Sequence, residues 1–169
     1  LEVLHGRVDR RHHQQGGGSL MQWGYEPSVD HVLDVAENLR EVDEVEVSLS
    51  HNMNGREAVI ESWAYSDIIR GMVTDDGVAC GLCGVVGKRI WMLGTDRLTE
   101  NRRARWQLCV DGRKWVDTCL EELGGPLFNQ VYSKNTESIK WLKHLGFTVE
   151  RPRPFGPSAA LFCDFWRAS

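Results

Sequence analysis

The chain has 169 residues, with 20 Lys and Arg against 24 Asp and Glu and a formal net charge of −4. This length predicts one domain, and the weakly acidic balance excludes an overall nucleic-acid signal. No apolar run reaches membrane-spanning length, no stretch has the apolar core of a signal peptide, and five cysteines, an odd number, favour reduced thiols in a cytosolic setting.

The first twenty residues lack the pattern of a folded domain. They hold a basic cluster, followed by a glycine run, made of Arg7, Arg10, Arg11, His12 and His13. Three interpretations stay open: an arm that binds nucleic acid or a neighbouring subunit, a disordered tail, or upstream sequence read through before Met21. The last rests on residues 15–17, Gln-Gly-Gly, which can encode a ribosome-binding sequence. We therefore assign residues 1–20 to one of these and 21–169 to a single domain.

The next segment predicts a short strand at residues 21–26 and a helix that begins after Ser28, a good N-cap. Eight acidic residues and one basic residue, Arg40, lie between Glu26 and Glu46. This run is interpreted as a solvated acidic face or as a docking surface for a basic partner. Residues 42–52 are interpreted as a continuation of that helix or as a loop over a substrate mouth.

A second helix is predicted from residue 55 to 63, with Asn54 as its cap. Three strands follow at residues 68–73, 78–86 and 89–94, because an Asp-Gly turn and a Gly-Lys turn separate them. Cys80 and Cys83 lie in the middle strand, and their odd spacing predicts opposite faces, so no metal site is assigned.

The second half predicts a helix over residues 103–123 with Trp106 on its apolar face, then a strand at 128–132 parallel to the strand that ends near Gly94. A further helix ends at Gly146, and residues 159–166 form a final edge strand. The fold class is therefore α/β (mixed α+β), with a central mixed, mostly antiparallel sheet of six to seven strands and helices on both faces.

Residues 128–147 carry a family resemblance. Asn135 and Thr136 stand where the helix begins, about ten residues before Leu145-Gly146-Phe147. This pattern resembles the last conserved block of the GNAT acyltransferase superfamily, whose strand and helix form one wall of the acetyl-CoA slot. The resemblance implies a GNAT-like fold.

A narrower resemblance rests on residues 90–96, Ile-Trp-Met-Leu-Gly-Thr-Asp, on residues 113–117 and on residues 138–142. These runs are similar to a phage-encoded GNAT-like family that includes an internal virion protein of short-tailed phages. The likeness covers roughly residues 21–150.

The resemblance implies a cofactor slot between residues 93–95 and 135–138. The phosphates of CoA would lie at residues 101–106, where the glycine of the family pattern is missing and arginines are present instead. These arginines could bind phosphate, an acidic protein surface or a nucleic-acid backbone, or form a solvated helix start. The predicted cofactor-binding residues are Leu93, Thr95, Arg102, Arg103, Arg105, Asn135 and Ser138.

The catalytic residues of the family are harder to place. Leu142 stands where many GNAT enzymes have a tyrosine acid, and a leucine cannot donate a proton. His144 and Lys143 are close in sequence but are expected to point away from the Leu142 face, and Glu61 or Asp67 could act as a base. No catalytic or metal-binding residue is therefore assigned.

Two functions follow from these resemblances. The first is a virion structural or morphogenesis protein with a degenerate acetyl-CoA site, which acts in the host cytoplasm during infection, can enter the virion and binds other virion proteins. The alternative is an acetyl-CoA-dependent N-acetyltransferase that modifies an amine on a small molecule or protein. Nucleic acid is a partner only through the basic arm or the arginine cluster.

Overall fold

The computed structural model describes residues 22–168, so the interpretations of residues 1–20 lie outside the described part. Eight strands form one sheet in the order β1-β2-β3-β4-β5-β8-β6, and β7 pairs with β8 beside this path. The β4–β5 pair is parallel, and the other pairs are antiparallel. This confirms the predicted mixed, mostly antiparallel α/β class, with one strand more than predicted.

The chain enters the sheet through β1 (Gln22–Tyr25) and then forms three helices, not two: α1 (Val29–Glu37), α2 (Glu41–His51) and α3 (Gly55–Tyr65). Ser28 and Asn54 cap α1 and α3 as predicted, and Asn54 forms a capping box with Glu57. Residues 42–52 are neither a continuation of α1 nor a loop. Acidic residues in the first turn of α2 suit its positive end, and Asn52 ends it in the left-handed conformation.

The predicted meander is confirmed as β2 (Ile68–Val73), β3 (Ala79–Val86) and β4 (Arg89–Gly94), followed by the short 3₁₀ helix η1 (Asp96–Leu98). The Asp-Gly turn works because Gly77 takes a φ of +80°. The expectation for the two cysteines of β3 is wrong: a register shift opposite Met72 and Val73 interrupts the alternation, and Cys80 and Cys83 pack in one core cluster.

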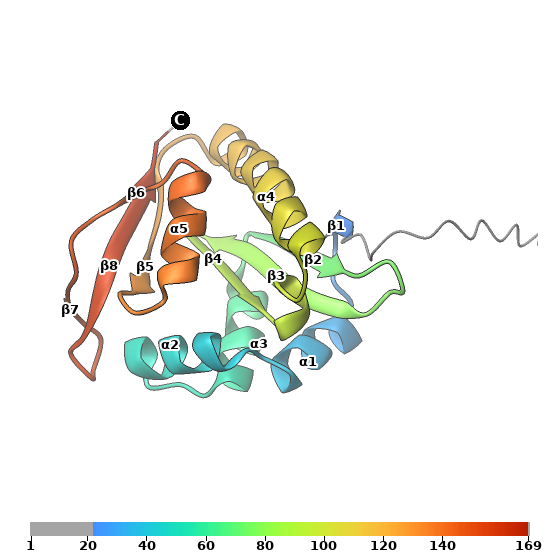
Figure 1. Ribbon diagram of the computed structural model, residues 1–169, viewed down its shortest axis with the longest axis horizontal. Coiled ribbons are helices and arrows are strands. Elements are labelled where there is room, and N and C mark those ends of the chain that lie inside the picture. The colour runs from blue at the N-terminus through green and yellow to red at the C-terminus, as the bar shows by residue number, and fades with distance from the viewer. Residues whose placement is uncertain (1–21, 169) are drawn as a thin grey trace, which may run out of the picture.

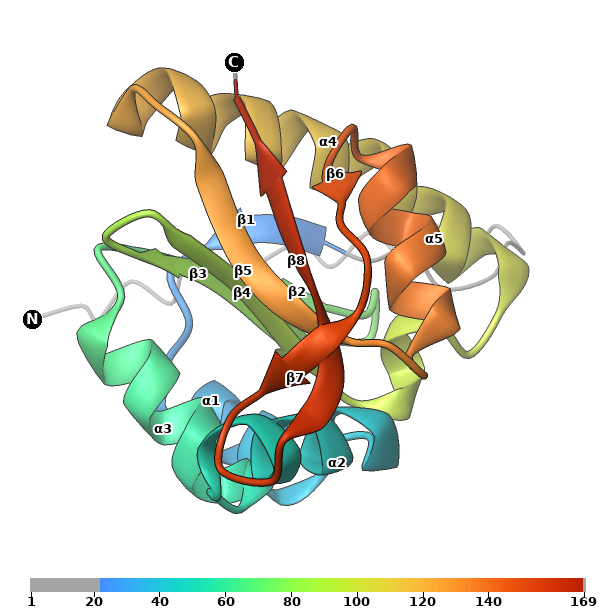
Figure 2. The ribbon, with the colours of Figure 1, turned by 90° about the vertical axis from the view of Figure 1, so that its left-hand side faces the viewer.

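The second half contains α4 (Arg102–Leu123), β5 (Leu127–Tyr132), α5 (Thr136–His144), β6 (Thr148–Val149), β7 (Arg153–Phe155) and β8 (Ala160–Arg167). The prediction of β8 as an edge strand is wrong, because β8 pairs with β5 on one side and with β6 and β7 on the other (Figure 2). Trp106 is also not on the buried face of α4: it is 64 % exposed, and Ala104 and Leu108 begin that face.

The helices cover the two faces of the sheet. Helices α1, α2 and α3 lie on one side, and α4 and α5 lie on the other (Figure 1). The α1/α3 side is packed around Val35, Val59 and Leu82, and the α4/α5 side is packed around Val116 and Leu142. These two layers fix both faces of the strands that form the cavity described below.

The parallel strands β4 and β5 meet only at their starts. Arg89 and Phe128 are the one registered pair, and the N–H of Phe128 donates to the carbonyl of Lys88 at 3.0 Å. Beyond this pair the strands part, while β5 stays paired with β8 along its whole length. The sheet therefore has a V-shaped gap with its apex at Arg89.

Candidate functional site

The gap between β4 and β5 opens into a cavity of about 390 Å³. Trp91 and Leu93 line it from the side of α1 and α3, where they contact that core cluster. Met92, Trp141 and Leu142 line it from the side of α4 and α5. The cavity thus passes between two strands and is bounded from both faces of the sheet, so two molecules could meet inside it.

Some backbone groups on the edge of β4 that faces the gap already form hydrogen bonds. The N–H of Thr95 bonds to Cys80 in β3, so alternate residues, Ile90, Met92 and Gly94, direct their backbone groups towards the gap. The carbonyl of Ile90 accepts from the Asn129 side chain at 2.7 Å. Met92 presents its N–H and carbonyl to the gap at a level where β5 does not pair with β4.

Helix α2 closes the open end of the gap at β4. The N–H of Gly94 donates to Asp43 Oδ2 at 3.0 Å, and the N–H of Arg40 donates to the carbonyl of Gly94 at 2.9 Å. Asp43 is only 5 % exposed and also accepts from the Arg40 guanidinium at 2.9 and 3.0 Å. Burial raises the pKa of Asp43, and the Arg40 charge and the Gly94 N–H oppose that rise.

Glu46 reaches the opposite wall of the same gap. Its Oε2 accepts from the Tyr132 N–H of β5 at 3.2 Å and from Asn135 Nδ2 at 3.0 Å. Both bonds fall on Oε2, and Glu46 lines the cavity, so Oε1 is the oxygen left for a ligand. Burial raises the pKa of Glu46 to about 7, against the two hydrogen bonds that favour the charged form.

These two acids correct the interpretation of the acidic run as a wholly solvated face. Asp43 and Glu46 turn inward with Ser50, at positions i, i+3 and i+7 of α2. That spacing was visible in the sequence and was the signal for an inward polar stripe. It was missed because the run as a whole has the composition of a solvated surface.

Ser50 and His51 form a second polar contact in the cavity wall. His51 Nδ1 lies 2.7 Å from Ser50 Oγ, and Ser50 Oγ donates to the carbonyl of Glu46 at 2.6 Å. Because the serine proton is already committed, His51 donates to Ser50 and keeps Nε2 without a proton. Burial lowers the pKa of His51, and the nearby Arg89 charge lowers it further. This pair is not an activated nucleophile.

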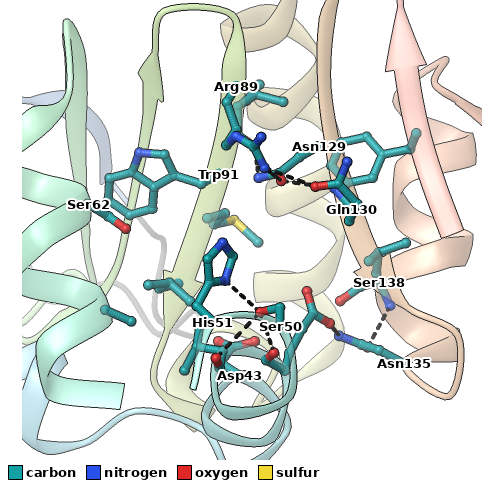
Figure 3. A pocket seen from close by; sticks show the side chains of 18 of the residues that line it. Asp43, Ser50, His51, Ser62, Arg89, Trp91, Asn129, Gln130, Asn135 and Ser138 are labelled. Carbon is teal, nitrogen blue, oxygen red and sulfur yellow. Dashed lines mark hydrogen bonds between the residues drawn. The ribbon is translucent and has the colours of Figure 1, made fainter. Parts of the chain in front are cut away.

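Arg89 stands at the apex of the gap, and its side chain reaches towards Asn129 and Gln130 of β5 (Figure 3). Its Nη1 donates to Asn129 Oδ1 at 3.2 Å and to Gln130 Oε1 at 2.9 Å, and its guanidinium lies 5.6 Å from the centre of the Phe128 ring. Both oxygen acceptors are neutral amides. Within residues 22–168, no carboxylate forms an ion pair with Arg89.

The structure brings three of the predicted cofactor-binding residues, Leu93, Asn135 and Ser138, into the cavity wall. Asn135 also caps α5 by accepting from the Ser138 N–H at 3.2 Å, as predicted. Thr95 is buried beside β3, with its hydroxyl 3.4 Å from the Cys80 carbonyl, and does not line the cavity.

The three predicted arginines lie at the start of α4, outside the cavity wall. All of them, Arg102, Arg103 and Arg105, are exposed. Arg105 donates to the Thr99 carbonyl at 2.8 Å, and Asn101 caps the helix by accepting from the Ala104 N–H. The cluster is therefore available to an anion from solvent.

Of the remaining candidate residues, some line the cavity and others do not. Glu61 lines the cavity, whereas Asp67 accepts from the Gly87 N–H at 2.7 Å in a turn and does not line it. Leu142 is buried in the cavity wall, and Lys143 and His144 are exposed, as helical geometry predicted. Over residues 22–168, no three His, Cys, Asp or Glu side chains gather as a metal would require. No helix in that part is long and apolar enough to span a bilayer.

Comparisons with known proteins identify the fold. No family model matches the sequence, and no curated protein matches it either. Solved structures do match: an acetyltransferase of the GNAT family from Bacillus anthracis has a TM-score of 0.57 at 9 % identity and covers 91 % of this chain and 96 % of its own. A Bacillus subtilis acetyltransferase in complex with CoA has a TM-score of 0.57 at 9 % identity, covering 89 % and 99 %.

A third similar structure is the ribosomal-protein-S18-alanine N-acetyltransferase from Escherichia coli. It has a TM-score of 0.56 at 11 % identity and covers 87 % of this chain and 92 % of its own. The arrangement of strands and helices is therefore the GNAT fold, as the sequence resemblance implied. At these identities the likeness extends to the fold alone, and fold does not fix function.

Proposed function

We propose that the protein is an acetyl-CoA-dependent N-acetyltransferase that uses the cavity between β4 and β5. The observation that carries this proposal is the carboxylate of Glu46, with a pKa of about 7, inside a gap bounded from both faces of the sheet. A transferase needs two substrates to meet at one base. This cavity offers that arrangement.

Glu46 is the general base. An amine is protonated at neutral pH and must lose its proton before nitrogen can attack a carbonyl carbon. A carboxylate with a pKa of about 7 is partly ionised at neutral pH and can hold that proton on Oε1. Asn135 and the Tyr132 N–H hold Oε2, so the orientation of the carboxylate is fixed before the amine arrives.

The cavity also fits the thioester arm of acetyl-CoA. The free backbone groups of Met92 can pair with its amides, and Ser138 and Trp141 form the wall on the α4/α5 side. Arg102 and Arg103 supply positive charge for the phosphates in place of the missing glycine loop. Acetyl-CoA, when bound, supplies the activated acetyl group.

A second candidate is the non-enzymatic role of a phage protein in virion structure or morphogenesis, with other virion proteins as partners. Helix α2 favours this candidate, because Arg40 and Asp43 occupy the Gly94 backbone groups that could otherwise hold a cofactor. Leu142 also favours this candidate, since a leucine side chain cannot protonate a thiolate. The arginines of α4 would then bind an acidic surface of a neighbour.

A calorimetric titration with acetyl-CoA separates the two functions. Micromolar binding, followed by thiol release in the presence of a panel of amines, supports the transferase. A protein that binds no acetyl-CoA and releases no thiol with any amine refutes it and leaves the virion role. Desulfo-CoA is the control ligand for specific binding, because it keeps the phosphates without the reactive sulfur.

A further inference from the structure

The guanidinium of Arg89 is charged, half-buried and held in a fixed position without a counter-ion among residues 22–168. Gln130 Nε2 donates to Asp164 Oδ1 at 2.9 Å, which turns the Gln130 amide oxygen towards Arg89. Asp164 itself pairs with Arg153. The Asp164 carboxylate is therefore already bound, and the hydrogen bonds that position Arg89 go to neutral amides.

Only one of the guanidinium nitrogens of Arg89, Nη1, makes these bonds. Nε and Nη2 remain, and Arg89 lines the cavity, so donors are left for a ligand. His51 stands near the same charge, and burial and Arg89 both lower its pKa, which favours the neutral imidazole. A positive, partly desolvated pocket end with a neutral imidazole beside it is suited to one carboxylate.

Arg89 and Glu46 belong to opposite ends of the cavity. Figure 3 shows Arg89, Asn129 and Gln130 at one end, with Asp43, Ser50 and Asn135 at the other. Glu46 bonds to Asn135 and to Tyr132, and Arg89 bonds to Gln130, two residues earlier on β5. At about 3.3 Å per strand residue, the two β5 residues to which these groups bond, Gln130 and Tyr132, are offset by roughly 7 Å along the strand.

The rest of the cavity wall is mainly apolar or aromatic and includes Met53, Tyr65, Trp91 and Phe155. From this geometry we infer that the acceptor is an amino-carboxylate whose amine and carboxylate are separated by an uncharged spacer, with the carboxylate on Arg89 and the amine at Glu46. This inference rests on the proposed function and adds the chemical class of its acceptor. An offset of roughly 7 Å between the two binding positions on β5 disfavours α-amino acids, in which the amine and the carboxylate share one carbon.

The test uses a homologous series of acceptors: glycine, β-alanine, γ-aminobutyrate, δ-aminovalerate and ε-aminocaproate, each compared with the n-alkylamine of the same length. We expect kcat/KM to rise from glycine to the longer members and to exceed that of the matched alkylamine by roughly 10- to 100-fold, the ratio expected for a shielded charge-assisted hydrogen bond. Equal values for the acid and its matched amine at every length would overturn the inference.

Variants of Arg89 test whether this residue causes the preference for the amino acid over the matched alkylamine. In Arg89→Gln the preference for acid over alkylamine should collapse to about one, and Arg89→Lys should restore part of it, because lysine keeps the charge without the planar fork. Arg113→Gln, an exposed arginine of α4, is the matched control and should keep the full preference. A preference that survives in Arg89→Gln contradicts the assignment.

A binding measurement distinguishes failure of the inference from failure of the transferase. N-acetyl-ε-aminocaproate and its methyl amide are titrated calorimetrically into wild-type protein and Arg89→Gln, without acetyl-CoA. Tighter binding of the acid, lost in Arg89→Gln, supports the carboxylate site even if no turnover is found. Turnover of plain amines without any preference for the acid refutes the carboxylate site and leaves the transferase intact.

Discussion

Asp43 in α2 accepts a hydrogen bond from the backbone N–H of Gly94, 51 residues later, at 3.0 Å. Glu46, one turn further along α2, accepts from the N–H of Tyr132 in β5. Each carboxylate thus takes the place of a missing neighbouring strand, one on each side of the gap. Helix α2 holds β4 and β5 apart and at the same time satisfies their open edges.

Replacing Asp43 by Asn should destabilise the protein. The Arg40 side chain is only 12 % exposed and would lose its charged partner, which costs about 3–5 kcal/mol for a buried pair. Urea unfolding of Asp43→Asn measures this loss, with the exposed Glu41→Gln of the same helix as control. The double variant Arg40→Met/Asp43→Leu should recover part of the stability. A loss below about 1 kcal/mol for Asp43→Asn would mean that the pair contributes as little as a surface ion pair.

Replacing Glu46 by Gln should lower kcat by roughly 10²–10⁴-fold, the usual contribution of a general base. The ratio of kcat/KM for wild type over Glu46→Gln should fall about tenfold per pH unit below about 7, because only the ionised carboxylate accepts a proton. Amine protonation cancels in this ratio. Glu61→Gln, another acid of the cavity wall, tests whether the effect belongs to Glu46. A pH-independent ratio would show that Glu46 is not the base.

The same group predicts how stability depends on pH. The folded-state pKa of about 7 lies above the ordinary value of 4.5, so the native state holds more protons between these values and the free energy of unfolding falls as pH rises through them. Glu46→Gln has no carboxyl group to titrate at this position, so it does not lose stability in this way as pH rises. Its stability relative to wild type should therefore rise from pH 4 to pH 8 by up to roughly 3 kcal/mol, at 1.36 kcal/mol per pKa unit. A constant difference across this range would mean an unperturbed carboxyl.

Reversing the exposed charges at the start of α4 tests the arginine cluster. Arg102→Glu/Arg103→Glu should melt within about 2 °C of wild type, because neither side chain is buried, yet lose an anionic partner. For a transferase the lost partner is acetyl-CoA, measured by calorimetry; for a virion protein it is incorporation into particles. Arg113→Glu/Lys140→Glu carries the same change in charge at other exposed sites and should lose neither. If Arg102→Glu/Arg103→Glu keeps both acetyl-CoA binding and incorporation into particles, the arginine cluster is only a solvated helix start.

Local patterns predicted much of the fold. The Asp-Gly and Gly-Lys turns placed the meander, and Ser28, Asn54 and Asn135 placed three helix starts, because caps and turns depend on a few adjacent residues. Of the cavity wall, Leu93, Asn135 and Ser138 were found through the family resemblance. Each of these signals involves only a few neighbouring residues, so it can be recognised without knowledge of the tertiary structure.

What could not be predicted depends on contacts between distant segments. Asp43 and Glu46 turn inward only because β4 and β5 part beside α2, and Arg89 is a site residue only because the apex of the gap lies there. Strand β8 is interior because it pairs with β6 and β7 on one side and with β5 on the other, and no local pattern encodes the pairing with β5, whose partners lie 30 to 40 residues away. Hydrophobic periodicity shows which face of a helix or strand is buried, but it does not show which other element pairs or packs with it.

The interior position of β8 sets the order in which a growing chain can complete the cavity. Strand β5 shares one registered pair with β4 and six with β8, so most of its support is synthesised after it. Residues 133–159 must be translated first, which takes roughly 1–5 s at 5–20 residues per second. Until β8 pairs with it, β5 has an open edge that a chaperone or another chain can contact once β5 has left the ribosome. Slow codons in this stretch should therefore reduce the yield of folded protein more than slow codons in the first meander.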